Sequence, residues 1–174
     1  LWGAKLYHTN LTGANLSGAR LSNADLSQSE LTGADLSNAE LYNTQLMGAN
    51  LSEANLAGAD LQKAQLTNTN LYRANLTSAW LASAQLQDAN LSQANLFKST
   101  LNSANLQDAD LSQANLMEAS LIKANLQDVD LQDADLSKTI LFKASVSKAA
   151  LIKAQLCLTS LPDYTMHSRD CDRT

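Results

Sequence analysis

The sequence predicts an all-β solenoid, and three observations lead to that fold class. Leucine occupies every fifth position from Leu1 to Leu161, with Val146 as the exception. Two residues before each of these positions lies a small side chain, which is usually alanine, and Asn, Asp, Gln or Glu mostly fills the position between them. Because this period runs through nearly all of the 174 residues, we expect one repetitive domain.

A five-residue period fits neither a regular helix nor a flat strand. In a helix a step of five residues rotates each leucine by about 140°, which scatters the leucines around the cylinder. The two-residue alternation of a strand does not divide five. The small residue and the following leucine are two apart, however, so they share one face of an extended segment. The chain must then turn before the next pair faces the same interior, and repeated extension and turning around one axis is a β-solenoid.

The repeat units resemble a known family. Units such as ADLSN, ANLSE, ANLAG and ADLQK are similar to the Leu-centred AxLxx repeats of the pentapeptide-repeat family, of the type common in cyanobacteria, from about residue 1 to residue 161. The resemblance implies a right-handed quadrilateral β-helix with four pentapeptides per coil, and thus about eight coils in residues 1–161. It also implies that leucine fills the centre and the small residue lies beside it, while the other positions face outward.

The regular repeat stops after Leu161, and residues 162–174 are expected to form a capping tail. Pro162 followed by Asp163 is typical of a helix start, so we predict a short helical cap that runs to about Asp170. Such a tail would cover the open backbone edge of the last coil, which otherwise invites aggregation.

The two cysteines, Cys157 and Cys171, lie near the end of the chain. A disulfide between them would pin the tail and would favour an oxidising compartment. The resemblance to lumenal members of the family points to the periplasm or the thylakoid lumen in that case. Two free thiols in a cytoplasmic protein, or a metal site that also uses His167, are the other interpretations, and the sequence leaves all three open.

The stretch NLQDVDLQDADL concentrates acidic residues. Under a twenty-residue coil, Asp88, Asp108 and Asp128 stack in one column, and Asp110 and Asp130 stack beside them. The stretch lacks the glycine and the distal glutamate of a calcium loop, so no metal site is predicted. Two interpretations remain, a solvated face that opposes edge association and an acidic surface that a basic partner recognises.

Several apolar side chains occupy positions expected to face outward. They are scattered surface residues, a seat for the tail, or a partner-binding patch. Trp2 and Tyr7 lie on a first coil without an evident cap, so either an upstream segment covers it or two molecules pair there as a homodimer. The outward apolar residues are Phe97, Met117, Ile122, Ile140, Phe142 and Ile152.

The function predicted from these features is a non-enzymatic protein-interaction or scaffold module with an unknown protein partner. The net charge of −5 argues against direct nucleic-acid binding, and no apolar run is long enough to span a membrane. No phosphate-binding loop, serine-hydrolase or zinc-protease motif occurs, so no catalytic residue and no cofactor is predicted. The resemblance implies one alternative, a DNA-mimicking inhibitor or protector of DNA gyrase that acts through the acidic face, as the quinolone-resistance members of the family do.

Overall fold

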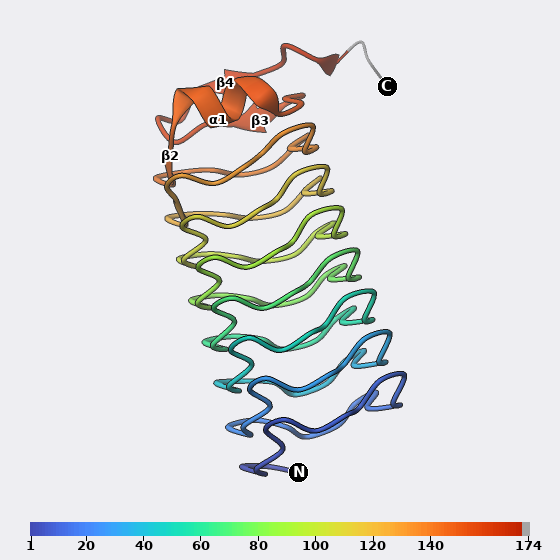
Figure 1. The fold of residues 1–174 in the computed structure, drawn as a ribbon. Helices are drawn as coiled ribbons and strands as arrows, with labels where there is room; N and C mark the ends of the chain where they lie inside the picture. Colours follow the sequence, from blue (N-terminus) through green and yellow to red (C-terminus); the bar gives the residue numbers. More distant parts are fainter. Residues whose placement is uncertain (172–174) are drawn as a thin grey trace.

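The computed structural model describes residues 1–171, and in it the chain winds into a stack of twenty-residue coils (Figure 1). Parallel bridges join residues twenty apart, from Lys5↔Asp25 to Ile140↔Ser160. Two hydrogen bonds accompany a typical bridge: Leu86 N donates to Asn105 O at 2.7 Å, and Asn105 N donates to Ala84 O at 3.0 Å. Each coil therefore satisfies the backbone of its neighbours, as a solenoid requires.

A tight turn follows each inward leucine. In the turn after Leu86, Ala89 N donates to Leu86 O at 3.1 Å, and the intervening Asp88 has a φ of 56°. This left-handed conformation suits glycine, asparagine and aspartate best. All six glycines of the chain occupy this turn position, including Gly33 with a φ of 63°. Turns thus recur at a fixed spacing of five residues along each coil.

Leucine and small side chains fill the interior of the stack. Every repeat leucine from Leu21 to Leu141 is at most 1% exposed. Where threonine replaces alanine beyond the first coil, its hydroxyl donates to a leucine carbonyl of the preceding coil, as from Thr139 Oγ1 to Leu116 O at 2.7 Å. These hydroxyls are buried without losing a hydrogen bond, which explains why the repeat tolerates them.

Regular strands are rare in this fold. β1 (Asn125–Leu126) pairs in parallel with β2 (Ser145–Val146), and most other coil contacts in the described residues are single bridges. The cause is the five-residue period, because the next turn begins before a longer strand can form. The prediction of an all-β solenoid therefore holds as a stack of bridged coils, and no sheet in residues 1–171 closes around the axis.

The C-terminal end departs from the repeat at α1 (Lys148–Lys153), which lies at the end of the stack opposite the N-terminus (Figure 1). Ser147 caps this helix, since its side chain accepts a hydrogen bond from Ala150 N at 3.1 Å. Ala150 stands where the repeat usually has a polar residue, and it is buried. No helix within the described residues is long and apolar enough to cross a membrane.

The predicted helix from Pro162 to Asp170 is wrong. The segment belongs instead to an antiparallel hairpin of β3 (Thr159–Ser160) and β4 (Met166–His167). Asp163 Oδ1 accepts a hydrogen bond from Thr165 N at 3.1 Å, and Tyr164 has a φ of 66°. Asp163 thus stabilises a turn rather than a helix start, and the left-handed Tyr164 is incompatible with a helix.

Candidate interaction surfaces

The five aspartates predicted as an acidic face lie on two neighbouring columns, which we call the acidic corner. Asp88, Asp108 and Asp128 occupy the same turn position in successive coils and are exposed. Asp88 N donates to Gln107 O at 3.1 Å, and Asp108 N donates to Gln127 O at 3.0 Å. These bonds hold the three residues in register, at the spacing of about 4.8 Å that separates bridged strands.

The second column of the acidic corner contains Asp110 and Asp130, which form a parallel bridge. Their carboxylates accept hydrogen bonds from Ser112 N at 2.8 Å and from Gln132 N at 3.0 Å. Asp130 Oδ1 also lies 3.6 Å from Lys153 Nζ of α1. The other four carboxylates of the acidic corner form no ion pair within residues 1–171.

Three ion pairs elsewhere on the stack join neighbours in one column. Glu118 lies between Lys98 and Lys138, with nitrogen-to-oxygen distances of 3.6 and 3.5 Å. Arg20 and Glu40 pair in the same way at 3.2 Å. Such exposed pairs add little stability, but they show that stacked positions can hold opposite charges. The acidic corner instead stacks three aspartates in successive coils, with two more in the neighbouring column.

The predicted apolar residues fall into two columns and two isolated positions. Phe97 stacks on Met117, and Ile122 stacks on Phe142. The Phe142 ring packs against Tyr164, with ring centroids 4.0 Å apart, so part of this column does seat the tail. The side chain of Ile140 is 42% exposed and Ile152 lies in α1, 70% exposed. The six residues therefore lie at four separate places on the surface.

Side-chain ladders of asparagine run along the stack, and the sequence analysis did not identify them. Asn75 Nδ2 donates to Asn55 Oδ1 at 3.0 Å, and Asn55 Nδ2 donates to Asp35 Oδ1 at 3.1 Å. The same Asn75 Oδ1 accepts from Thr77 N at 3.2 Å, so one side chain links two coils and fixes its own turn. The recurrence of asparagine at intervals of twenty was the signal for these ladders. Further links join Asn115 to Asn95, Asn90 to Asn70, Asn70 to Asn50, and Asn125 to Asn105.

Asp35 ends one of these ladders, and its surroundings favour the charged carboxylate. The Ser37 backbone N–H, donating at 3.0 Å, lowers the pKa of Asp35 below its ordinary value of 3.8, and the Ser37 hydroxyl and Asn55 lower it further. Burial acts in the opposite direction, but the hydrogen bonds outweigh it. The carboxylate is therefore an acceptor at neutral pH, with the same role as the asparagines above it.

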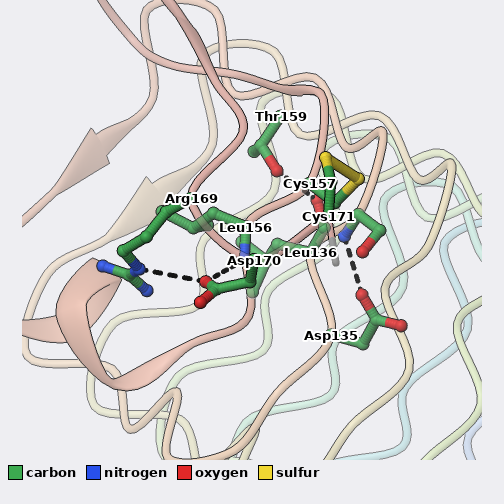
Figure 2. Close-up of a disulfide and its surroundings, with 9 residues drawn as sticks. Asp135, Leu136, Leu156, Cys157, Thr159, Arg169, Asp170 and Cys171 are labelled. Atoms are coloured by element: carbon green, nitrogen blue, oxygen red, sulfur yellow. Dashed lines mark hydrogen bonds and ion pairs between the residues drawn. A yellow bond between two sulfur atoms is a disulfide. The ribbon is translucent and has the colours of Figure 1, made fainter. Parts of the chain in front are cut away.

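Residues 162–171 contact the last coil through a buried carboxylate, and we call these residues the cap. Leu156 N donates to Asp170 Oδ2 at 3.0 Å, and Arg169 Nε donates to the same oxygen at 3.0 Å (Figure 2). Asp170 is 4% exposed. A disulfide joins the adjacent Cys157 and Cys171, whose Cα atoms are 4.7 Å apart (Figure 2). With both cysteines joined, the structure does not use them with His167 as metal ligands, and no group of three or more candidate ligands gathers in the described residues.

The two ends of the stack differ in how they are covered. At the first coil, Trp2 is 73% exposed and Tyr7 is 56% exposed, while Leu6 and Leu11 are only partly buried. At the last coil, a surface cavity of about 530 Å³ lies between α1 and the cap, lined by Asp133, Lys153 and Arg169 among others. Pairing of two copies through the first coil stays a prediction.

Comparison with known proteins identifies the repeat. A family model described as pentapeptide repeats matches in eight copies, over residues 1–33, 14–52, 49–84, 81–117 and 119–156. No functionally curated protein matches the chain.

Solved structures of pentapeptide repeat proteins are similar to this chain. HetL from the cyanobacterium Nostoc sp. strain PCC 7120, involved in heterocyst differentiation regulation, is 31% identical over 94% of this chain and 89% of its own, with a TM-score of 0.31. A protein of the Arabidopsis thaliana thylakoid lumen is 28% identical over 65% of this chain and 68% of its own, with a TM-score of 0.46. A trypsin-treated form of QnrB1, a plasmid-mediated fluoroquinolone resistance protein, is 18% identical over 92% of this chain and 91% of its own, with a TM-score of 0.61. The likeness to QnrB1 indicates a common fold and nothing finer.

Proposed function

This chain belongs to the pentapeptide repeat family, and we propose that it acts as a non-enzymatic protein-interaction or scaffold module. The observation that carries the proposal is the filled interior, in which the repeat leucines from Leu21 to Leu141 are at most 1% exposed. Catalysis needs groups that converge on a reacting atom, whereas this packing directs the polar side chains outward in stacked columns. We also take the coils to be right-handed, four-sided and about eight in number. We further take residues 162–174 to be the capping tail, of which residues 172–174 lie outside the part of the chain that the structure describes.

The surface we assign to the partner is the acidic corner. Its like charges stack about 4.8 Å apart, and four of its five carboxylates have no cationic partner within residues 1–171. Stacked like charges repel modestly in water, and a basic partner would relieve that repulsion. Complementary charge also guides a partner to one face and sets the orientation of the complex.

A charge-reversal experiment tests this assignment. Asp108→Lys with Asp128→Lys should abolish binding of partners that a photo-crosslinking residue at Gln107 captures from the native host. The matched control is Glu53→Lys with Asp133→Lys, which makes the same change of charge on a different column and should leave the captured proteins unchanged. If both variants lose partner binding equally, only the net charge matters. If neither variant loses partner binding, the acidic corner is not the binding surface.

Protection or inhibition of DNA gyrase is the second candidate function. Its support is the acidic corner together with the fold shared with QnrB1, a fluoroquinolone resistance protein. The same variants decide it in a supercoiling assay. The function would be established if the wild type inhibits or protects gyrase, if Asp108→Lys with Asp128→Lys abolishes this effect, and if the control variant retains it. The control variant is again Glu53→Lys with Asp133→Lys. No effect of the wild type at tens of micromolar would exclude it.

We place the protein in an oxidising compartment, either a periplasm or a thylakoid lumen. The support is the Cys157–Cys171 disulfide, because such bonds persist outside reducing cytosol. Thiol trapping in intact cells tests the assignment, since no thiol should react before reduction. Two reactive thiols in the trapped protein would place it in the cytoplasm.

Pairing of two copies through the first coil is a further proposal. The exposed Trp2 and Tyr7 would bury apolar surface in such a homodimer. Light scattering should then give twice the monomer mass for the wild type, and Trp2→Glu should return it to the monomer mass. A monomeric wild type at high concentration would refute the pairing.

A further inference from the structure

The cap on the last coil is built from two adjacent pairs of residues. Leu156 and Asp170 form a reciprocal contact, in which Leu156 N donates to Asp170 Oδ2 at 3.0 Å and Asp170 N donates to Leu156 O at 3.1 Å. The residues that follow them, Cys157 and Cys171, form the disulfide (Figure 2). The covalent bond therefore lies directly beside the hydrogen bonds that hold the cap in place.

The reciprocal contact replaces the pairing that one coil normally gives the next. In the coil before, Leu136 N donates to Gln155 O at 3.0 Å, a backbone carbonyl. For Leu156 the acceptor is instead a carboxylate whose side chain is 5% exposed. Arg169 holds this carboxylate and also donates to Ala154 O at 2.6 Å, which ties the cap to the end of α1.

Apolar side chains lie next to the cap, since Leu151, Leu156 and Leu161 line one surface pocket together with His167 and Arg169. Leu156 is 2% exposed, while Leu151 and Leu161 are partly buried against the core. Both cysteines are partly buried rather than fully enclosed, and we take the disulfide to be within reach of a reductant in solution.

We propose that the Cys157–Cys171 disulfide is a redox-operated latch that keeps the end of the last coil covered. A dithiol reductant opens it by thiol–disulfide exchange: one thiolate attacks a cysteine sulfur, the second thiolate resolves the mixed disulfide, and the reductant leaves as its own disulfide. The protein gains two electrons and two protons, which give two thiols. The tail then separates from Leu156 and uncovers the backbone edge and the leucines beneath it.

The opening is local because the coils do not depend on the latch. From Lys5↔Asp25 to Ile140↔Ser160 the coils are joined by their own bridges, whereas the disulfide closes a loop between residues separated by 14 positions. In the entropy model, releasing such a loop raises the opening equilibrium by roughly a hundredfold. The remaining contacts, including the Tyr164 ring on Phe142, then hold the tail less firmly than in the oxidised protein.

Amide hydrogen exchange measured by NMR, with and without dithiothreitol, tests the latch. The amides of Leu156 and Asp170 should exchange about a hundredfold faster after reduction, while those of Leu86 and Leu106 should keep their rates. Thiol alkylation and mass spectrometry establish that the bond is present before reduction and broken after it.

A variant separates the latch from other effects of the reductant. Cys157→Ser with Cys171→Ser should show the fast exchange of the reduced protein, with no further response to dithiothreitol. Three results would overturn the proposal: no disulfide in the oxidised protein, unchanged rates at Leu156 and Asp170 after reduction, or an equal loss of protection in the coils. The wild-type comparison decides the matter even if the variant fails to fold.

Discussion

Asparagine before the central leucine has a double role that its position in the repeat did not reveal. Asn75 fixes its own turn through Thr77 N and bonds across the coils to Asn55. The sequence predicted a tolerated polar residue facing water, because one pentapeptide shows only that the position is polar. The link becomes visible when residues twenty apart are compared, and that comparison needs the coil length.

Replacing Asn75 with alanine should therefore destabilise the protein. The change removes the hydrogen bonds that Asn75 forms with Thr77 N and with Asn55 Oδ1, at an expected cost of about 1–2 kcal/mol. Urea unfolding measures the loss. The exposed turn residue Ser103 supplies the control, because Ser103→Ala should change the free energy of unfolding by less than about 0.5 kcal/mol. An equal effect of both changes would contradict the ladder.

Asp35 should make stability depend on acidity. Its pKa is lower in the folded chain than in the unfolded chain, because Ser37 and Asn55 donate to the carboxylate. This contribution is complete above the ordinary pKa of 3.8 and is lost as pH falls through the lower folded value. Carbon NMR of the Asp35 carboxyl should show a midpoint below 3.8.

The variant Asp35→Asn supplies the check. Asparagine occupies the equivalent position in the next coils, so the ladder should persist. Acid unfolding should then become less steep in that pH range. An unchanged profile would mean that Asp35 does not contribute.

At the scale of elements, the sequence predicted the coils better than their end. A turn in every pentapeptide follows from the leucine period, and the structure has these turns up to the one after Leu141. The sequence predicts a helix at Pro162 because Pro-Asp is common at helix starts. The same dipeptide is also common in turns, so it does not distinguish the two structures. The pairing of β4 with β3 favours the turn at Pro162 and Asp163 over a helix. Nothing in the sequence near Pro162 indicates that pairing. The real helix, α1, arises where alanine takes the polar slot at Ala150.

Removing the helix cap should destabilise this end of the molecule. Ser147→Ala deletes the acceptor for Ala150 N, at an expected cost of about 1 kcal/mol. Ser147→Asp should retain stability, since aspartate also caps helices. Thermal unfolding measures both variants. Equal stability of the alanine and aspartate variants would show that the hydrogen bond from Ala150 N to the Ser147 side chain contributes nothing to stability.

For the whole molecule, the sequence was most informative because one rule sets the entire core. A five-residue period with two inward positions allows a solenoid and little else, and the observed coils follow it from Leu1 onward. What the period does not encode is chemistry at the surface. Asp130 meets Lys153 only because α1 interrupts the repeat, and the cap forms only because Asp170 reaches Leu156.

A core truncation should affect the stack as a unit. Leu86 is fully buried, so Leu86→Ala should cost about 2–5 kcal/mol through lost packing and a cavity. Leu158 is 47% exposed, and Leu158→Ala should cost far less. Chemical denaturation of both variants tests the difference. Similar midpoints would mean that the interior is not packed as described.

The central claim is that residues twenty apart stack into columns, and spin-label distances measure this most directly. Labels at Asn23, Lys63 and Lys143 would lie in one turn column, with the native disulfide left intact. The Lys63–Lys143 pair should be about 19 Å apart and the Asn23–Lys143 pair about 29 Å apart, since each coil adds about 4.8 Å. The Asn23–Lys143 distance should exceed the Lys63–Lys143 distance by about 10 Å, the length of two coils. A difference far from this value would contradict the stacked-column structure.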